Sequence, residues 1–349
     1  MPKIEAKRIC LVRTSALGDT VHALALANAI KRGYPEASLT WILQDLPHDM
    51  VCRQPAIDRF ITFDRNADLK TWRKFLFRLR KEAPYDLAII PQASAKVSLI
   101  AMFLPAKVKL GFNFSRAREF HWLMTNAHIP ARPMQHVQDQ FFEFSDFLGI
   151  EKEPVCWDFC FTDMERKWQN DFFTAIKKPA VGFVIASSSI EKDWPTASFA
   201  RVMDHVANLG YAPVIIGGPG RSEAEIAERI SGLCRHAPIL ALEKPIRHTM
   251  LQLAGCSLVV APDTGPLHMA VALNVPTIGM YGYSNPGRCG PYRRFHDLLI
   301  DFYNEPEKED APITRKTRPG RMRMITPEMV IDKIEYGLEK YGTTPHDRN

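Results

Sequence analysis

Residues 258–292 read LVVAPDTGPLHMAVALNVPTIGMYGYSNPGRCGPY, and the second half of the chain is organised around this stretch. Its first apolar run, 258–261, is short enough to be a buried strand. Asp263 and Thr264 then form a turn, and Pro266 suits the first turn of a helix that continues in small residues. A second apolar run follows that helix. The pattern predicts a strand, a helix and a second strand, which together form one unit of a parallel sheet.

The turn before this helix is a place where an anion can bind. It lies at the carboxyl end of a strand and against a helix N-terminus, where main-chain N–H groups and the helix dipole favour a phosphate. The next loop, 282–290, contains three glycines and can therefore approach a ligand closely. Asp263 could equally be a plain helix cap, because every α/β protein contains such units. The spacing alone leaves both interpretations open.

The composition is that of an ordinary globular protein with a moderate excess of positive charge. The chain has 349 residues, which suggests two domains, each able to bury its own core. Hydrophobic residues make up 46% and charged residues 24%, as in soluble globular proteins. The net charge of +6 favours anionic partners, namely phosphorylated small molecules, nucleic acid or an acidic membrane surface. A merely solvated basic surface would have the same charge.

The cysteines and the amino terminus indicate a cytoplasmic protein. The seven cysteines are scattered and contain no CxxC pair, which is typical of reduced thiols. The first residues carry charges but no apolar core of a signal peptide. No run approaches the roughly 18 apolar residues that a membrane-spanning helix needs. We therefore expect any contact with a membrane to be peripheral.

Strand and helix patterns alternate on both sides of a weakly patterned connection. The predicted strands of the first half are 8–13, 38–43, 59–63, 86–91 and 108–112, and those of the second half are 180–186, 212–216, 258–261, 276–281 and 298–301. Helical patterns separate most of them, including a basic amphipathic one at 72–81. This alternation predicts two doubly wound α/β domains that face each other across a cleft. The predicted boundaries are 1–155, a connection at 156–178, 179–325, and a last helix in 326–349.

Asp19 is the first candidate for chemistry. It follows Gly18 at the turn from the first strand into a helix, so it should face the cleft. A carboxylate there could accept a proton from an attacking hydroxyl group. Aspartate is also a good residue for the start of a helix, and this structural interpretation stays open.

Two further turns in the second half carry candidate ligand-binding residues. Lys192 lies in a loop after the strand 180–186, where its cation could neutralise a leaving phosphate and nearby serines could bind phosphate oxygens. Gly217 and Gly218 follow the next strand, and Glu223 or Glu225 could reach a ribose hydroxyl. A solvated lysine and a plain glycine turn are the structural alternatives.

Several common motifs are missing from the sequence. There is no DxD triplet, so we expect no carboxylate cage for a divalent metal ion. The glycine turn does not have GxGxxG spacing, and no P-loop, GxSxG or HExxH motif occurs. We therefore expect neither a metal nor an organic cofactor. A nucleotide diphosphate would have to be held by helix dipoles and lysine.

The motifs fall in an order that resembles glycosyltransferase family 9, the bacterial lipopolysaccharide heptosyltransferases. The resemblance rests on SALGD at 15–19, GFNFSRARE at 111–119, KDWP at 192–195, Gly217-Gly218, DTGPLH at 263–268 and YGYSNP at 281–286. It covers nearly the whole chain, and DTGPLH is its most specific block. The family implies a GT-B fold of two Rossmann-like domains, with a carboxyl-terminal helix that crosses back to the amino-terminal domain. It assigns the acceptor to residues 1–155 and the donor to residues 179–325.

The resemblance also assigns roles to residues. Asp19 would be the general base, and Lys192 would steady the donor diphosphate. The donor would be bound by Ser188, Gly217, Gly218, Glu223, Asp263, Thr264, Gly265, Pro266, Leu267 and His268. Candidates for acceptor phosphates or carboxylates are Lys96, Arg116 and Arg118, although these three could also be ordinary surface charges.

The resemblance implies an inverting transferase that moves heptose from ADP-L-glycero-D-manno-heptose to Kdo–lipid A, most like heptosyltransferase I. The alternatives are a heptosyltransferase II, a member with another glycan or protein acceptor, and a nucleotide-sugar-binding protein without turnover. We expect the cytoplasmic face of the inner membrane as its location, with a peripheral contact to the anionic surface. Nucleic acid is not expected as a partner, because the basic residues are not aligned with stacking aromatic residues.

Overall fold

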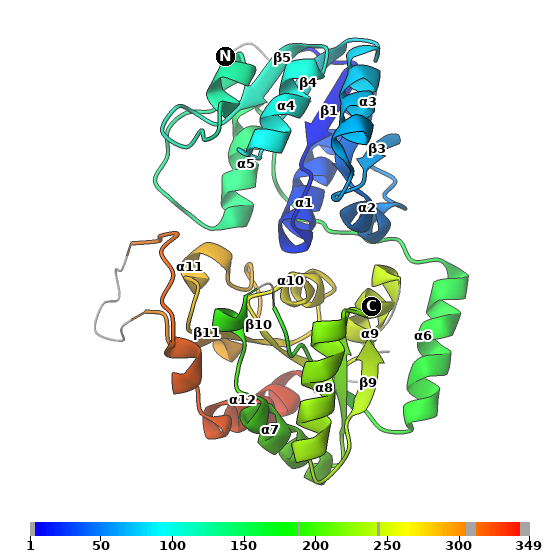
Figure 1. The fold of residues 1–349 in the computed structure, drawn as a ribbon, viewed down its shortest axis with the longest axis vertical. Helices are drawn as coiled ribbons and strands as arrows, with labels where there is room; N and C mark the ends of the chain where they lie inside the picture. The colour runs from blue at the N-terminus through cyan, green and yellow to red at the C-terminus, as the bar shows by residue number, and fades with distance from the viewer. Residues whose placement is uncertain (1–3, 188, 243–244, 305–311, 343–349) are drawn as a thin grey trace. The chain divides into compact units, whose positions relative to one another are not determined.

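The chain divides into two compact units, Met1–Cys160 and Phe161–Asn349 (Figure 1). The division falls inside the segment 156–178 that the sequence predicts as a connection. The computed structural model describes residues 4–187, 189–242, 245–304 and 312–342.

The amino-terminal unit is built on a parallel sheet of six strands in the order β3-β2-β1-β4-β5-β6. The strands are β1 (Arg8–Val12), β2 (Ser38–Gln44), β3 (Arg59–Phe63), β4 (Tyr85–Ile89), β5 (Ala106–Gly111) and β6 (Ala127–His128). Ile9 of β1 is in register with Leu39 of β2 and Leu87 of β4. The strand order reverses between β1 and β4, and such a switch point is where α/β sheets bind ligands.

Helices cover both faces of this sheet, which explains why its strands are continuous apolar runs. They are α1 (Leu17–Gly33), α2 (Asp45–Val51), α3 (Leu69–Arg80), α4 (Ala95–Phe103) and α5 (Val137–Phe147). Helices α3 and α4 pack together over Cys10 and Ala88, in one buried cluster. Ile9 and Leu11 alternate with Cys10 along β1 and point to the other face. Helices α1 and α5 pack against each other.

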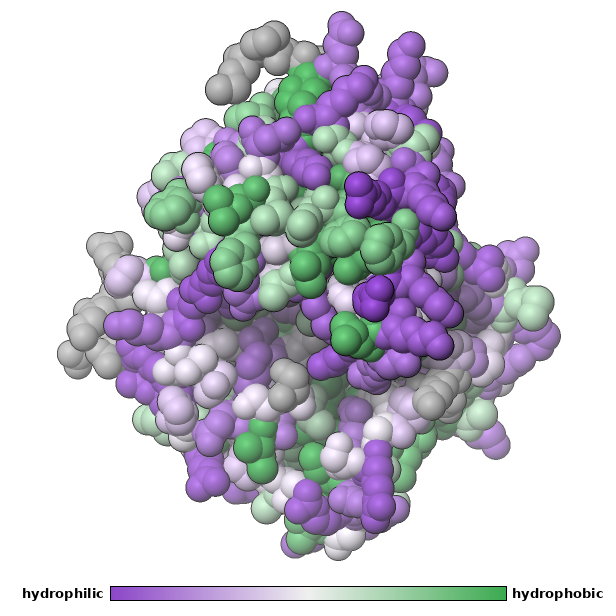
Figure 2. All heavy atoms as spheres, turned by 45° about the horizontal axis from the view of Figure 1, so that its top comes forward, coloured by the Kyte–Doolittle hydropathy of each residue, from purple (hydrophilic) through white to green (hydrophobic). Residues whose placement is uncertain are grey.

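Apolar side chains are also exposed on the amino-terminal unit. Figure 2 shows such side chains gathered on this unit, with hydrophilic side chains alongside them. Exposed large apolar side chains of this unit lie on α3, on α4 and on the short 3-10 helix η1 (His121–Met124) with its preceding loop, and also at Leu46 and Met134. Within the described residues, no helix is both long enough and apolar enough to cross a bilayer.

The second unit repeats the same topology. Its parallel sheet has the order β12-β11-β10-β7-β8-β9. The strands are β7 (Ala180–Phe183), β8 (Ala212–Gly217), β9 (Ile239–Leu242), β10 (Leu258–Pro262), β11 (Thr277–Tyr281) and β12 (Ile300–Asp301). The order reverses between β7 and β10, so this sheet has its own switch point. Two Rossmann-like α/β units confirm the predicted fold class.

The segment predicted as a connection contains a helix, α6, that belongs to the second unit. The helices of this unit are α6 (Asp163–Ile176), α7 (Thr196–Asn208), α8 (Arg221–Leu233), α9 (Ile246–Ala254), α10 (Gly265–Ala272), α11 (Pro286–Cys289) and α12 (Pro327–Tyr341). Helix α6 packs on α9. Arg247 of α9 binds Glu165 of α6 through two hydrogen bonds of 2.5 and 3.0 Å. These bonds hold the pKa of Glu165 at about 2, so the pair stays charged at neutral pH.

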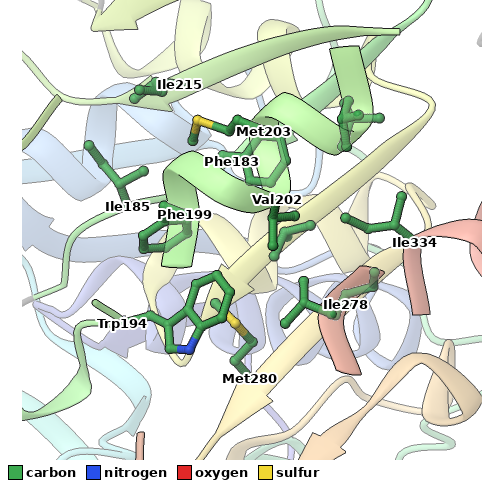
Figure 3. Packing of buried hydrophobic residues seen from close by; sticks show 14 of the residues in the cluster. Phe183, Ile185, Trp194, Phe199, Val202, Met203, Ile215, Ile278, Met280 and Ile334 are labelled. Atoms are coloured by element: carbon green, nitrogen blue, oxygen red, sulfur yellow. The ribbon is translucent and has the colours of Figure 1, made fainter. Parts of the chain in front are cut away.

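The core of the second unit lies between the sheet and helices α7 and α12 (Figure 3). Trp194 and Phe199 meet edge to face with ring centroids 5.0 Å apart, and both are buried. The indole Nε1 of Trp194 donates to the carbonyl of Ile325 at 2.9 Å, which satisfies its polar group. Trp194 follows Lys192 by two residues, so this packing anchors the lysine loop to the core.

Helix α12 packs in the second unit. Val330 and Ile334 are fully buried in its core, and the helix contacts α7, β10 and β11. These contacts describe the helix within its own unit, so the expectation that 326–349 pack back on the amino-terminal domain stays a prediction. The apolar face of α12 is buried against its own unit, and burial of such a face stabilises a docked helix.

The sequence patterns missed short elements. Helices α2 and α4 and strand β9 were not predicted. The sequence of α4, AKVSLIAMF, is apolar on nearly every side, so it has no helical periodicity to detect. The sequence of β9, ILAL, is short and lies between two prolines.

Replacing Ile334 by alanine tests the docking of α12. We expect the free energy of unfolding to fall by about 2–5 kcal/mol, because a buried isoleucine leaves a cavity. Urea denaturation followed by circular dichroism measures the change. Asp332→Ala, on the exposed side of the same helix, is the control and should change the stability little. Equal stabilities of the two variants would contradict the packing of this face.

Candidate functional site

An ion pair joins the two loops at the switch point of the second sheet. Lys192 ends the 3-10 helix η2 (Ile190–Lys192), which follows β7, and Asp263 directly follows β10. The ammonium group of Lys192 donates to Oδ2 of Asp263 at 2.8 Å and to its main-chain carbonyl at 3.2 Å. The two residues are 71 positions apart and meet because β7 and β10 are neighbours. The structure thus brings together two residues that the sequence indicated separately.

Two more side chains complete the surroundings of Asp263. Ser284 Oγ donates to Oδ2 at 2.6 Å, and His268 Nε2 lies 3.6 Å from Oδ1. The Asp263 side chain is only 12% exposed. Ser284 was not among the predicted site residues, although it lies within the YGYSNP motif at 281–286. Its position beside Asp263 depends on β11 being the next strand, which the motif does not reveal.

The electrostatics keep Asp263 ionised. Burial alone would raise its pKa, but the hydrogen bond with His268 and the cation of Lys192 outweigh burial and hold the pKa well below its usual range. Burial and the Asp263 charge together raise the pKa values of the neighbouring Tyr281 and Cys289, so both stay neutral. The centre is therefore a fixed carboxylate with a lysine beside it.

Helix α10 begins beside this ion pair. Thr264 is its N-cap residue, yet the Thr264 hydroxyl donates to the carbonyl of Pro262 at 3.2 Å. Among the described residues, no side chain caps α10, so the N–H groups of Gly265 and Leu267 in its first turn face no capping oxygen. Asp263 is therefore not a helix cap. Pro266 follows Gly265 in the first turn as expected, and the buried Leu267 fixes the helix in the core.

The glycine turn after β8 holds a carboxylate. Glu223 Oε2 accepts a hydrogen bond from the main-chain N–H of Gly218 at 3.1 Å. A Cβ atom at Gly217 would lie 2.0 Å from Glu223 Oε1, so only glycine allows this approach. Glu225 instead pairs with Arg221 on the exposed side of α8 at 3.0 Å. Of the two predicted glutamates, Glu223 is therefore the one that belongs to the turn.

Burial changes the acid–base behaviour of this turn. Burial raises the pKa of Glu223, and the nearby charge of Asp193 raises it further, while the hydrogen bond from Gly218 lowers it. Burial also raises the pKa of Asp193, which follows Lys192. The remaining predicted donor residue, Ser188, lies outside the described residues.

Asp19 lies at the corresponding place in the amino-terminal unit. It is in the first turn of α1, directly after β1 at the switch point, and its side chain is 34% exposed. Its Oδ2 forms an ion pair with the guanidinium of Arg13 and accepts from the N–H of Ala16 at 3.4 Å. Among the described residues, Oδ1 has no partner. Asp19 thus helps to start the helix and still offers one oxygen to a ligand.

Arg13 was not predicted as a site residue, because it reads as the end of a strand. Its guanidinium donates to the carbonyl of Pro91 at 3.0 Å and lies 5.2 Å from the ring centroid of Phe141. The next residue, Thr14, donates its N–H to Gln92 at 2.8 Å. These contacts connect the loops after β1 and β4. They give Arg13 a fixed position from which it holds Asp19.

The three predicted acceptor residues have different surroundings. Lys96 lies in the first turn of α4 and donates to the carbonyl of Arg65 at 3.0 Å. Arg116 forms an ion pair with the buried Glu143 at 2.7 Å, so its charge is matched within the unit. Arg118 is exposed in the loop before η1. The loop that carries Arg118 is joined to α4 through Glu119, which accepts from the N–H of Ala95 and, at 2.7 Å, from Ser98 Oγ.

The basic segment 315–323 and the loop 282–290 pack against each other. The guanidinium of Arg321 donates to the carbonyls of Phe302 and Tyr303, and that of Arg318 lies 4.7 Å from the ring centroid of Tyr303. A Cβ atom at Gly282 would lie 2.6 Å from the main-chain nitrogen of Met322. Gly282 therefore allows close approach of the protein's own chain, while the approach of the loop 282–290 to a ligand stays a prediction.

A family model matches a large part of this chain. The model for "Glycosyltransferase family 9 (heptosyltransferase)" matches residues 72–316, which include Lys192, Glu223 and Asp263.

Individual relatives match over most of their length. The chain is 29% identical to the lipopolysaccharide core heptosyltransferase OpsX of Haemophilus influenzae, covering 87% of each chain. It is 27% identical to lipopolysaccharide heptosyltransferase 1 of Salmonella typhimurium, over 82% of this chain and 91% of the other. It is 24% identical to lipopolysaccharide heptosyltransferase 2 of the same species, over 96% and 99%.

Solved structures of similar proteins have the same fold. A glycosyl transferase family 9 protein from Veillonella parvula gives a TM-score of 0.81 at 23% identity, over 96% of this chain and 98% of the other. The E. coli heptosyltransferase WaaC with ADP gives 0.72 at 24% identity, over 95% and 99%.

Removing the lysine tests the electrostatics around Asp263. Lys192→Met should lower the free energy of unfolding at pH 7 by about 2–3 kcal/mol, because a largely buried carboxylate loses its charged partner. The pKa of Asp263 in the folded wild type lies below its unfolded value. The resulting stability is therefore present above the unfolded pKa of about 4 and is lost as the pH falls toward the folded pKa.

The difference between variant and wild type should accordingly stay nearly constant from pH 7 to about 5 and shrink as the pH is lowered further, from about 4 toward 2, measured by urea denaturation at each pH. Lys167→Met is the control, since it removes an exposed ion pair with Asp171 and should cost less than about 1 kcal/mol. A difference that stays constant over the whole pH range would show that Lys192 does not act through the Asp263 charge.

Proposed function

The chain belongs to glycosyltransferase family 9, the heptosyltransferases, and from this premise we propose that it transfers heptose from ADP-L-glycero-D-manno-heptose to Kdo–lipid A, as heptosyltransferase I. It is a glycosyltransferase of lipopolysaccharide core synthesis, and the choice of the first heptose is the finer part of the proposal. The observation that carries the proposal is the Lys192–Asp263 pair beside the uncapped start of α10.

The second unit offers what a nucleotide diphosphate needs. Two N–H donors of Lys192 are directed to Asp263, which leaves its third donor for a phosphate oxygen. The N–H groups of Gly265 and Leu267 and the dipole of α10 add donors beside it. This set binds the diphosphate and stabilises the charge that develops on ADP as it leaves. Asp263 contributes by fixing the lysine, and Ser284 and His268 fix Asp263 in turn.

Glu223 is the proposed contact of the adenosine ribose. Its carboxylate is held in the glycine turn after β8, at the same edge of the sheet as the lysine loop. A carboxylate in such a turn accepts hydrogen bonds from ribose hydroxyls. The surface pair of Glu225 with Arg221 gives that residue a separate role.

Asp19 is the proposed general base. The acceptor hydroxyl gives its proton to the free Oδ1 of Asp19 while its oxygen forms a bond to the anomeric carbon. The bond from that carbon to the phosphate oxygen breaks at the same time, and its electron pair leaves with ADP. Attack from the opposite face inverts the configuration. Arg13 holds the carboxylate in place through the other oxygen.

The acceptor is proposed to bind to the amino-terminal unit. Lys96 and Arg118 are the cations for its phosphates and carboxylates. Arg116 instead steadies the loop 111–119 through its ion pair with Glu143. A lipid A acceptor lies in a membrane, so the proposal includes a peripheral contact at the cytoplasmic face of the inner membrane.

Asp19→Asn tests the role of the base. The variant should transfer heptose about 10²–10⁴-fold more slowly, because the amide does not accept the proton. Its affinity for ADP should be unchanged. Purified protein is incubated with ADP-heptose and a panel of Kdo–lipid A acceptors, and the added heptose mass is followed by mass spectrometry. Calorimetry with ADP gives the affinity.

Asp146→Asn is the matched control, because Asp146 also pairs with an arginine and is also 34% exposed. It should retain full activity. Normal turnover by Asp19→Asn would refute the assignment of the base. Binding of ADP-heptose without any transfer by the wild type, over the whole panel, would favour a binding protein. Transfer only to acceptors that already carry one heptose would identify a heptosyltransferase II.

Gly217→Ala tests the ribose contact. The added methyl group would overlap the Glu223 carboxylate and displace it from the turn, so the Kd for ADP should rise about 10–100-fold. Gly220→Ala in the same turn is the control, because a Cβ atom there meets nothing within 4 Å. Calorimetry with ADP compares the two variants. An equal affinity in both would argue against Glu223 as a ligand of the nucleotide.

A further inference from the structure

The outward side of α3 is strongly cationic. Residues 69–81 contain six basic side chains and no acidic one. Lys70, Arg73, Lys74, Arg78 and Lys81 recur at intervals of three and four, so they share one exposed face of the helix. They line a shallow surface hollow together with Leu69 and Phe77. The donor and acceptor sites proposed above use none of these residues.

Nearby carboxylates do not neutralise this face. Asp68 accepts from the N–H of Thr71 at 2.7 Å and caps the helix, while Glu82 pairs with Arg59 on β3. Glu119 accepts from the N–H of Ala95. Among the described residues, none of the six cations in 69–81 has a carboxylate within ion-pair distance. The positive charge is therefore available to an external partner.

Helix α3 has a second, buried side that fixes it to the unit. Phe75, Leu76 and Leu79 are buried in the core against the sheet and α4. Packing in the core already requires these three residues, but it does not require Leu69 and Phe77, which stay exposed among the cations. A surface with both charges and large apolar side chains is unusual for a helix that only faces water.

The apolar part continues onto α4 and η1. Phe77 meets Phe103 of α4 edge to face at 5.9 Å, and Phe114 meets Trp122 of η1 at 5.6 Å. Helix α4 packs on both α3 and η1, and Ser98 Oγ donates to the carbonyl of Glu119 at 2.7 Å. The exposed fractions lie between 41% and 66% for Phe77, Leu99, Met102, Trp122 and Leu123.

We propose that the outward faces of α3, α4 and η1 form one surface that docks on an anionic lipid bilayer. We call it the α3–α4–η1 surface: the cations of 69–81 with Leu69, Phe77, Leu99, Met102, Phe114, Phe120, Trp122 and Leu123. Figure 2 shows apolar side chains gathered on this unit next to hydrophilic ones. The inference rests on the proposed function in one respect. A lipid-linked acceptor lies in a bilayer, and for this reason we choose a bilayer as the partner over other polyanions.

The mixture of side chains favours a bilayer. Lysine and arginine side chains extend to anionic headgroups while their aliphatic stems lie along apolar surface. Leu99, Met102 and Leu123 can enter the boundary between headgroups and acyl chains, as in amphipathic helices that lie on membranes. The phosphates of a nucleic acid would attract the cations but would leave these aliphatic side chains exposed to water.

The full-length protein is tested by flotation with large unilamellar vesicles of phosphatidylglycerol and phosphatidylethanolamine in a 1:3 ratio. The wild type should bind these vesicles and should bind vesicles of phosphatidylcholine at least tenfold more weakly. Binding should fall as NaCl is raised from 50 to 500 mM, because exposed charges are screened. Equal binding to both lipids, or no binding to either, would overturn the proposal.

Two sets of variants place the contact. Lys70→Gln/Lys74→Gln should lower vesicle binding about 30-fold, since each cation near an anionic surface contributes about fivefold. Lys316→Gln/Arg323→Gln is the control with the same change of charge, taken from the basic segment 315–323. Its binding should stay within about twofold of the wild type. A larger loss in this control than in the α3 variant would overturn the assignment to α3.

Phe77→Ser/Met102→Ser tests the apolar part and keeps every charge. The partition coefficient on anionic vesicles should fall about tenfold at 150 mM NaCl, from the loss of apolar area buried in the bilayer. Circular dichroism and urea denaturation check that the variants are folded. Lys70, Lys74, Phe77 and Met102 are all exposed, so we expect their replacement to leave the fold intact. Unchanged partition would show that the side chains do not enter the bilayer.

Two further measurements distinguish docking on a bilayer from self-association and from a defect in heptose transfer. Sedimentation without lipid detects self-association; if Phe77→Ser/Met102→Ser dissociates an oligomer while vesicle binding is unchanged, the surface is an interface between copies and the proposal fails. Transfer to a deacylated, water-soluble acceptor should be normal in the α3 variants. Vesicles without an acceptor report docking even if the protein transfers no heptose, so the two proposals fail separately.

Discussion

The ion pair between Lys192 and Asp263 is the contact on which the second unit depends. It connects the loops after β7 and β10, the two strands between which the sheet reverses its order. A parallel sheet has a crevice at this point, where ligands bind. The loops that line the crevice are positioned only by the contacts that they make with each other. The ion pair, with Ser284 on one side and the anchored Trp194 on the other, gives these loops a fixed geometry before any ligand arrives. A diphosphate bound as we propose meets donors that need no rearrangement, which is the condition for effective electrostatic stabilisation.

In the amino-terminal unit, different residues connect the two loops at the switch point of the sheet. Its switch point lies between β1 and β4, and Arg13 connects the two loops by holding both Pro91 and Asp19. Thr14 and Gln92 add a second connection. In each unit, therefore, a cationic side chain binds a carboxylate at the point where the strand order of the sheet reverses. The two sheets have the same strand topology, so each has a switch point at which such a pair can form.

The sequence predicted both sheets because their central strands are buried on both faces and appear as short apolar runs. It also indicated Asp19, Lys192, Asp263 and the glycine turn, because turns at strand ends have recognisable residues. It did not reveal which of these residues touch. The Lys192–Asp263 pair and the role of Arg13 follow from which strands are neighbours, and that is a long-range property without a local pattern. The burial of Val330 and Ile334 of α12 against α7 and the sheet was not predicted for the same reason, since an apolar helix face does not specify its partner.

Burial gives the two carboxylates different capacities. Asp263 is almost enclosed, and His268 and Lys192 keep its pKa low, so it cannot take up a proton during a reaction near neutral pH. It can only hold other groups in place. Asp19 is one-third exposed, has a single cation at one oxygen, and leaves the other oxygen accessible. A general base needs such an oxygen within reach of a hydroxyl group and a fixed orientation, and Arg13 supplies the orientation without covering the site. The two carboxylates look alike in the sequence, because each lies between a strand and a helix, but only the exposed one is suited to proton transfer.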